Sequence, residues 1–190
     1  ERGAGYEITL GGTAALDERG DIPDNADFSF GDSAWDSPFS LLALVRTGTA
    51  VLNRAIVGRW DITTGSELRE WMLDLDSAGK LQLRLYDESA NTQIGRVYDT
   101  ALVASTRYFL AATYDGSRAS TGIRLYSAAV RVDDANNNAG AYVAMENKAG
   151  LTYIGAREAA AGTATNFFNG SMGAIGVVAG ALSADEIQII

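Results

Sequence analysis

Arginine and tyrosine alternate at two places in the sequence, and this pattern is suited to binding sugar. Arg84 and Tyr86 form one pair, and Arg124 and Tyr126 form the other. An aromatic face covers the apolar side of a pyranose, while planar polar groups bind its hydroxyls. Trp35 joins these carbohydrate-binding candidates because it lies in a loop of Gly, Asp and Ser, where an exposed indole is costly.

Each of these candidates also has a purely structural explanation. If the two alternating segments are neighbouring strands, their Arg and Tyr side chains share one open face, but they would equally form ordinary cross-strand pairs. Trp35 would close one end of the fold. Trp60 and Trp71 are expected in the core.

The residue types exclude several kinds of chemistry. The chain has no Cys and no His, which removes thiol nucleophiles, Ser-His-Asp triads, disulfides and ordinary zinc sites. Only hard oxygen ligands remain, so the metal to consider is Ca²⁺. Asp134, Asn136 and Asn138 have the spacing of an EF-hand loop. The match fails because Gly140 comes one position late and Met145 stands where a bidentate Glu belongs.

Composition and charge limit the kinds of partner that the protein is expected to bind. The 190 residues are 47% hydrophobic and 21% charged, which is typical of a globular protein, and we expect one domain over residues 1–190. The net charge of −9 repels phosphate backbones and anionic lipid, so nucleic acid is not an expected partner. No apolar run approaches the roughly 20 residues of a membrane span, so no membrane insertion is expected. Because the chain begins with Glu1, we expect a processed product or part of a longer protein.

Alternation of apolar and polar residues predicts a chain built from strands. Leucine recurs at every second position over 81–85, and 71–75 alternate in the same way. Turn-forming residues 76–79 separate the two runs and predict a hairpin. The same pattern predicts further strands over 39–47, 55–60, 107–115, 123–132, 151–156 and 167–178, and weaker ones over 6–10 and 27–30.

Helix signals are scarce and gather at the C-terminus. Ser183 followed by Glu186 is a capping box, with Ile187 as the residue to be buried. Roughly ten strands with one short helical turn predict an all-β fold, an antiparallel two-sheet sandwich or jelly roll.

Several segments together resemble the laminin-G-like branch of the concanavalin A-like lectin/glucanase superfamily. The resemblance covers about residues 27–188, and each segment alone is weakly specific. The chain departs from the family pattern at Gly173, where an acidic residue is usual, and at Val178, Ala179 and Gly180, where an aromatic and a polar residue are usual. The segments that carry the resemblance are 36–41, 69–76, 79–81, 108–116, 168–173 and 181–187.

The resemblance implies a jelly roll. It also indicates which residues would be needed for catalysis and which could bind a metal ion. The family's glucanases carry Glu-x-Asp-x-x-Glu on one strand, but no Glu in this chain has Asp two positions later, so no enzyme is expected. Laminin-G-like domains often hold one calcium ion at the rim of the sandwich through Asp side chains. Asp32 and Asp36 are the candidates here, the alternative being that both are solvated turn residues; no cofactor is required.

We therefore expect a non-catalytic binding or adhesion module that contacts a glycan or cell-surface polymer, as part of a larger extracellular or virion-surface protein. The alternative is a structural virion protein, such as a phage capsid decoration or appendage, that contacts neighbouring subunits. Residues 19–21 also spell Arg-Gly-Asp, an adhesion tripeptide, although such short matches arise easily by chance.

Overall fold

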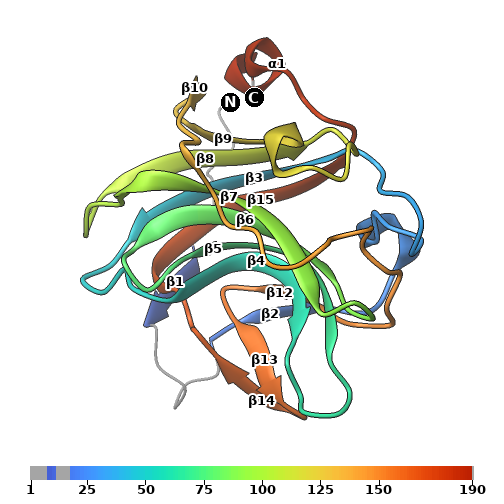
Figure 1. Ribbon diagram of the computed structural model, residues 1–190. Coiled ribbons are helices and arrows are strands. Elements are labelled where there is room, and N and C mark those ends of the chain that lie inside the picture. The colour runs from blue at the N-terminus through green and yellow to red at the C-terminus, as the bar shows by residue number, and fades with distance from the viewer. Residues whose placement is uncertain (1–7, 12–17, 190) are drawn as a thin grey trace.

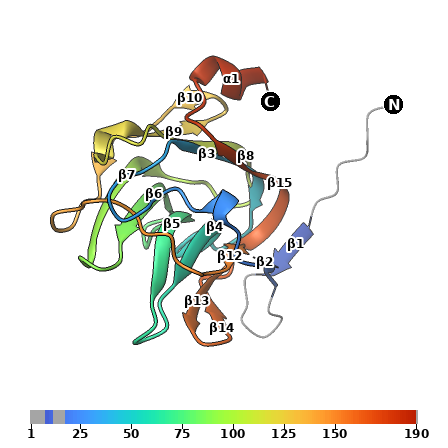
Figure 2. The same ribbon diagram turned by 90° about the vertical axis from the view of Figure 1, so that its right-hand side faces the viewer.

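The strands of the protein form two stacked sheets (Figures 1 and 2). The computed structural model describes residues 8–11 and 18–189. In spatial order the first sheet contains β1 (Ile8–Gly11), β15 (Asn169–Ala179), β3 (Phe39–Thr47), β8 (Arg107–Tyr114), β9 (Ile123–Ser127) and β10 (Val130–Arg131). The second contains β11 (Ala135–Asn136), β7 (Thr92–Ala101), β6 (Lys80–Asp87), β5 (Leu68–Leu75), β4 (Arg54–Asp61), β12 (Thr152–Ile154) and β2 (Gly20–Ile22).

A small hairpin extends the second sheet. It consists of β13 (Arg157–Ala160) and β14 (Thr163–Thr165), and it joins β4 by a single parallel bridge between Glu158 and Asp61. Otherwise the pairing within both sheets is antiparallel. The predicted antiparallel β-sandwich is therefore confirmed.

The core lies between the two sheets because the strands alternate as the sequence predicted. Leu73 and Leu83 of the second sheet meet Leu110 of the first in one continuous apolar cluster, and all three are fully buried. Trp71 is also fully buried in this cluster, and its indole nitrogen donates to the Phe28 carbonyl at 2.8 Å. Its predicted place in the core is confirmed.

The short helix α1 (Ala184–Ile189) lies on the outer face of the first sheet, opposite the β13–β14 hairpin (Figures 1 and 2). The predicted capping box is present: Ser183 Oγ accepts from the Glu186 amide, and Glu186 accepts from the Ser183 amide at 2.8 Å. Ile187 is fully buried against Leu42, Ala111 and Tyr126. The helix therefore covers part of this outer face.

Some predicted strand boundaries were wrong. Residues 27–30 do not form a strand, because the Asn25 side chain caps a 3₁₀ turn over Ala26–Phe28; a second 3₁₀ turn covers Ser120–Gly122. The segment 123–132 divides into β9 and β10, since Ala128 and Ala129 both have positive φ and make a tight hairpin turn. The weak strand over 6–10 is described only from Ile8 onward.

Candidate functional site

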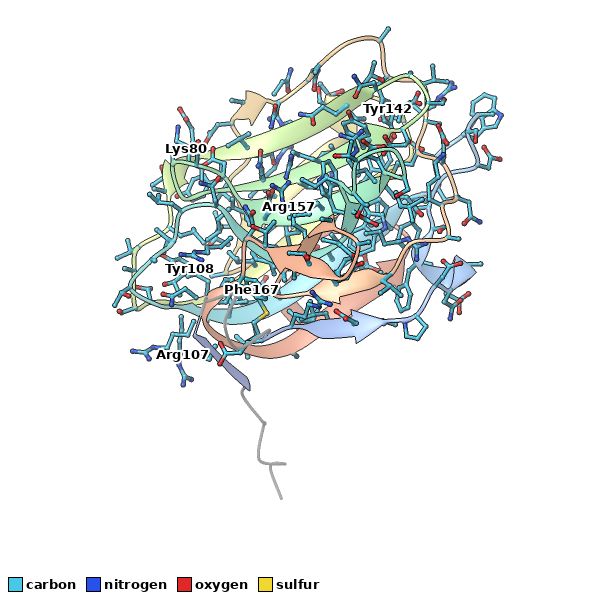
Figure 3. All side chains as sticks on the ribbon, turned by 90° about the horizontal axis from the view of Figure 1, so that it is seen from below. Lys80, Arg107, Tyr108, Tyr142, Arg157 and Phe167 are labelled. Atoms are coloured by element: carbon cyan, nitrogen blue, oxygen red, sulfur yellow. The ribbon has the colours of Figure 1, made fainter. Side chains whose placement is uncertain are left out.

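A polar hollow of about 510 Å³ opens on the outer face of the second sheet. Strands β5 and β6 form its floor, since the side chains that alternate with the core leucines point outward there. Figure 3 shows this face from below, with Arg157 near its middle. The lining residues are Asn53, Asp74, Asp76, Ser77, Gln82, Arg84, Val97, Asn136, Asn137, Arg157 and Asn166.

Arg84 is the central residue of the floor. Its Nη2 donates to Asp74 Oδ2 at 2.6 Å, and its guanidinium carbon lies 4.4 Å from the centre of the Trp60 ring. Tyr86 meets Trp60 edge to face at 5.4 Å. Trp60 is only 3% exposed, as predicted for a buried residue, but it lies beneath this outer face rather than between the sheets.

Two arginines and two aspartates line the hollow, and their charges act on one another. Burial raises the pKa of Asp74, although Arg84 opposes this. Burial also lowers the pKa of Arg157, as does the nearby positive charge of Arg84, with Asp74 acting in the opposite direction. Two guanidinium groups thus share the buried Asp74 carboxylate.

Amide side chains form one wall. Asn137 Nδ2 donates to Gln82 Oε1 at 2.8 Å, and Gln93 Nε2 donates to Asn137 Oδ1 at 3.0 Å. The loop that carries Asn137 approaches β7 closely because Gly95 lacks a side chain. A Cβ there would lie 2.9 Å from the Leu83 carbonyl oxygen and 3.1 Å from that of Asn137.

The opposite wall contains two asparagines in left-handed backbone conformation. Asn53 has φ 51° and Asn166 has φ 55°, values that asparagine tolerates better than most residues. Arg157 Nε donates to Asn166 Oδ1 at 3.3 Å. The hollow therefore presents amides, guanidiniums and a carboxylate, groups that can bind the hydroxyls of a sugar.

The structure separates the two Arg–Tyr pairs of the sequence analysis. Arg84 and Tyr86 lie on β6 of the second sheet, whereas Arg124 and Tyr126 lie on β9 of the first. The predicted shared open face is therefore wrong, because two strands with the same alternation pair into different sheets. Tyr126 is 2% exposed beneath α1, and Arg124 is exposed.

Tyr86 is itself largely covered. Its hydroxyl donates to Asn91, and the Arg69 guanidinium lies 3.8 Å from its ring centre. It supports Trp60 from the side, so its ring is not an open surface for stacking. A role in carbohydrate binding for Tyr86, Arg124 or Tyr126 stays a prediction.

Trp35 lies in the exposed loop that the sequence indicated. It is 64% exposed, and the Arg118 guanidinium carbon lies 4.2 Å from its ring centre. Arg118 Nη1 also donates to the Ala34 carbonyl at 3.0 Å, which ties the two loops together. Trp35 lies apart from the residues that line the polar hollow, so its predicted sugar contact belongs to a separate surface.

The carboxylates of Asp32 and Asp36 already accept hydrogen bonds. Asp32 Oδ1 accepts from the amides of Ala34 and Trp35, and Asp36 accepts from Tyr114 and Tyr142 through Oδ2 and from Met145 through Oδ1. Both groups would have to give up these donors to bind Ca²⁺. Within residues 8–11 and 18–189, no three acidic side chains gather in a way that could hold a metal ion.

The Arg-Gly-Asp tripeptide is not presented as a loop. Gly20 and Asp21 belong to β2, which pairs with β12, and Arg19 Nε bonds to Asp21 Oδ1 at 2.8 Å. A partner would have to compete with this internal ion pair.

Sequence reasoning missed most of the hollow. The sequence could have indicated that Asp74 and Gln82 point outward, because both alternate with core leucines on the strands of the predicted hairpin. Asn53, Asn137 and Arg157 carried none, since they come from turns and short strands far from that hairpin in the sequence.

Comparisons with solved structures find the same architecture in other proteins. The carbohydrate-binding module CBM40 of Ruminococcus gnavus IT-sialidase has TM-score 0.68 and 16% identity, over 97% of this chain and 95% of that one. The same module bound to α2,3-sialyllactose has TM-score 0.65 and 18% identity, with the same coverage. The binding domain of botulinum neurotoxin serotype G has TM-score 0.62 and 11% identity, over 96% of this chain and 41% of that one. At these identities the likeness shows the fold.

Two further comparisons, one with curated proteins and one with family models, bear on the family of this chain. No curated protein matches the sequence. Among the described residues, no helix is long and apolar enough to cross a membrane. The family model described as the concanavalin A-like lectin/glucanases superfamily matches residues 19–188, which is most of the chain. This chain therefore belongs to the concanavalin A-like lectin/glucanase superfamily.

Proposed function

We propose that this protein is a non-catalytic glycan-binding module whose ligand occupies the polar hollow of the second sheet. The observation that carries the proposal is the lining of that hollow: guanidinium, amide and carboxylate groups from separate parts of the chain converge on one concave face. Such planar groups match the paired hydroxyls of a sugar ring.

The comparisons support the proposal at the level of the fold. CBM40 of the R. gnavus sialidase is named as a carbohydrate-binding module, and one of its structures holds sialyllactose. A chain with the same architecture and a polar concave face is suited to the same kind of task. Parts of a leech trans-sialidase and of a Trypanosoma rangeli sialidase, 27% and 22% of those chains, also have this fold, but catalysis is not part of this proposal.

Recognition would depend on hydrogen bonds more than on aromatic stacking. Trp60, the large aromatic residue of this face, is covered by Arg84 and Tyr86. The polar groups that remain are the exposed amide of Asn53 and the partly exposed side chains of Asn137, Arg157 and Asn166. Polar sites of this kind select ligands by the geometry of their donors and acceptors.

A glycan array followed by calorimetry tests the proposal. Asn137→Ala removes an amide from the wall of the hollow and should weaken binding about tenfold, the usual loss for one or two hydrogen bonds. Asn147→Ala changes an exposed asparagine outside the hollow and should leave the affinity unchanged. Absence of binding to every glycan, or equal loss in both variants, would contradict the proposal.

We propose further that binding requires no metal. The hollow offers Asp74 and Asp76, and both already accept hydrogen bonds, from Arg84 Nη2 and from the amides of Ala78 and Lys80. Affinity should be the same with Ca²⁺ and with a chelator. A loss of binding on chelation would instead support the predicted calcium site at Asp32 and Asp36.

An extracellular or surface location is part of this proposal, because glycans are displayed there. Antibody labelling of intact cells or particles that carry the parent protein tests it. Labelling that appears only after permeabilisation would contradict it.

A structural role in an assembly is the second candidate function, and one observation favours it. An apolar hollow of about 420 Å³ lies on the outer face of the first sheet, lined by Leu42, Leu44, Phe109, Ala174, Ile175 and Gly176. Leu44 is 48% exposed. If this face joins copies of the chain, light scattering will show an oligomer that Leu44→Glu dissociates. A monomer at all concentrations would exclude such a contact.

A further inference from the structure

We infer that the polar hollow selects sugars that carry a carboxylate, through the guanidinium groups of Arg84 and Arg157. This inference rests on the proposed glycan-binding function and adds the chemical class of the ligand. Its starting point is that two guanidinium groups line the hollow together with the buried Asp74 carboxylate.

Both guanidiniums retain donors that a ligand can use. Arg84 donates to Asp74 through Nη2, and its Nη1 has no hydrogen-bond partner among residues 8–11 and 18–189, whereas its Nε is buried. The Arg157 side chain donates only through Nε, to Asn166, within the same described residues. Arg157 lies near the middle of the face (Figure 3), and its terminal nitrogens have no hydrogen-bond partner among the described residues.

The two cations also repel each other. The positive charge of Arg84 is among the causes that lower the pKa of Arg157. An anion placed between them would relieve this repulsion and satisfy unused donors, and a carboxylate fits the planar fork of a guanidinium. A negative group at this point would therefore be stabilised more than a neutral hydroxyl.

The other acidic residue of the lining is already engaged. Asp76 Oδ1 accepts from the backbone amides of Ala78 and Lys80 at 2.8 and 2.9 Å, which closes the turn between β5 and β6. The net charge of −9 gives no long-range attraction for an anion. Selection must therefore come from short-range contacts with Arg84 and Arg157.

Matched ligands isolate the contribution of the carboxylate. Titration calorimetry should compare 3′-sialyllactose with its methyl ester, which keeps the shape but removes the charge, and with lactose. A trigalacturonate and its methyl ester form a second arm, because sialic and uronic acids both supply a carboxylate. We expect the acid of at least one arm to bind about tenfold more tightly than its ester.

Arg157→Gln tests the residue assignment without disturbing the Arg84–Asp74 pair. It should reduce the affinity for the acid about tenfold more than the affinity for the ester, so the preference for the acid disappears while the ester still binds. Arg46→Gln is the matched control, since Arg46 is exposed on β3 of the other sheet.

The outcomes separate the two proposals. Equal binding of acid and ester, or an Arg157→Gln variant that still prefers the acid, overturns this inference and leaves glycan binding standing. Absence of binding to any sugar overturns both.

Discussion

Arg84 connects the buried aromatic residues of the second sheet with the polar hollow above them. Its guanidinium covers the Trp60 ring and pairs with Asp74, whose side chain is almost fully buried. Alternation within the predicted hairpin was enough to show that Arg84 points away from the core. Its neighbours in the hollow depend on contacts that the alternation does not encode.

Removing Arg84 should destabilise the fold through Asp74. Arg84→Met leaves a buried carboxylate without its hydrogen-bonded cation, and we expect the free energy of unfolding to fall by about 3 kcal/mol. Adding Asp74→Asn should recover most of this loss, because the uncompensated charge disappears. Urea unfolding of the two single variants and the double variant measures the coupling. A double variant less stable than Arg84→Met would contradict this account.

Glu70 is a second buried acid, and it lies outside the hollow. Its Oε1 accepts from Arg59 Nε and from the Lys148 amide, both at 2.9 Å. Neither the Arg59 nor the Glu70 side chain is exposed, and Arg59 also reaches Asp24. Burial raises the pKa of Glu70 from 4.5 to about 7, although the attraction of Arg59 opposes this.

This pKa predicts that stability falls as the pH rises. Because the folded pKa of Glu70 exceeds its unfolded value, its contribution is complete below pH 4.5 and is lost as the pH passes about 7. The free energy of unfolding should therefore be larger at the low end of this window, and Glu70→Gln should flatten the profile. The pKa of Asp133 is lowered to about 2, so Asp133 does not change the profile within the window. An unchanged slope in Glu70→Gln would contradict the assignment.

At the scale of elements, one loop shapes the wall of the hollow. The Asn137 and Gly95 backbones bond to each other at 2.9 Å, and Asn138 Oδ1 accepts from the Gly95 amide at 3.2 Å. The sequence analysis predicted no strand over 92–101, where β7 lies and where this loop packs. The Gly, Arg and Gln residues of β7 weaken its alternation.

Gly95→Ala should displace this loop. Its Cβ would lie 2.9 Å from the Leu83 carbonyl oxygen, so backbone must move, and overpacking of this kind costs about 1–3 kcal/mol. Urea unfolding should report that loss, and glycan affinity should fall because Asn137 is displaced. Gly20→Ala is the control, since a Cβ at that position has its nearest neighbour at 3.4 Å. Equal effects at both glycines would contradict the role of Gly95.

At the scale of the whole molecule, a single apolar cluster joins the two sheets. Phe39 of the first sheet packs against Trp71 of the second, with ring centres 5.9 Å apart, and Tyr114 meets Phe39 at the same distance. Neither sheet can bury its inner face without the other. The sheets should therefore unfold together.

This packing predicts one cooperative transition. Tryptophan fluorescence, which reports the buried Trp60 and Trp71, and far-ultraviolet circular dichroism, which reports the strands, should give the same urea midpoint. Two separate midpoints would show independently folding parts and contradict the single domain expected over residues 1–190.

The sequence by itself determined the fold class, most of the strands and the capped helix. Each of these depends on signals within a few residues, such as the alternation of 81–85 or the spacing of Ser183 and Glu186. Local side-chain direction follows from local backbone geometry, so it can be read along the chain.

Only the tertiary structure decided which residues form one site. The segments around Arg84 and Arg124 have the same alternation, yet they pair into different sheets, because sheet membership depends on long-range pairing. Arg157 reaches the hollow because its hairpin joins β4, and Asn137 because Gly95 lets its loop approach β7. Those contacts join residues far apart in the chain, and no local pattern specifies them.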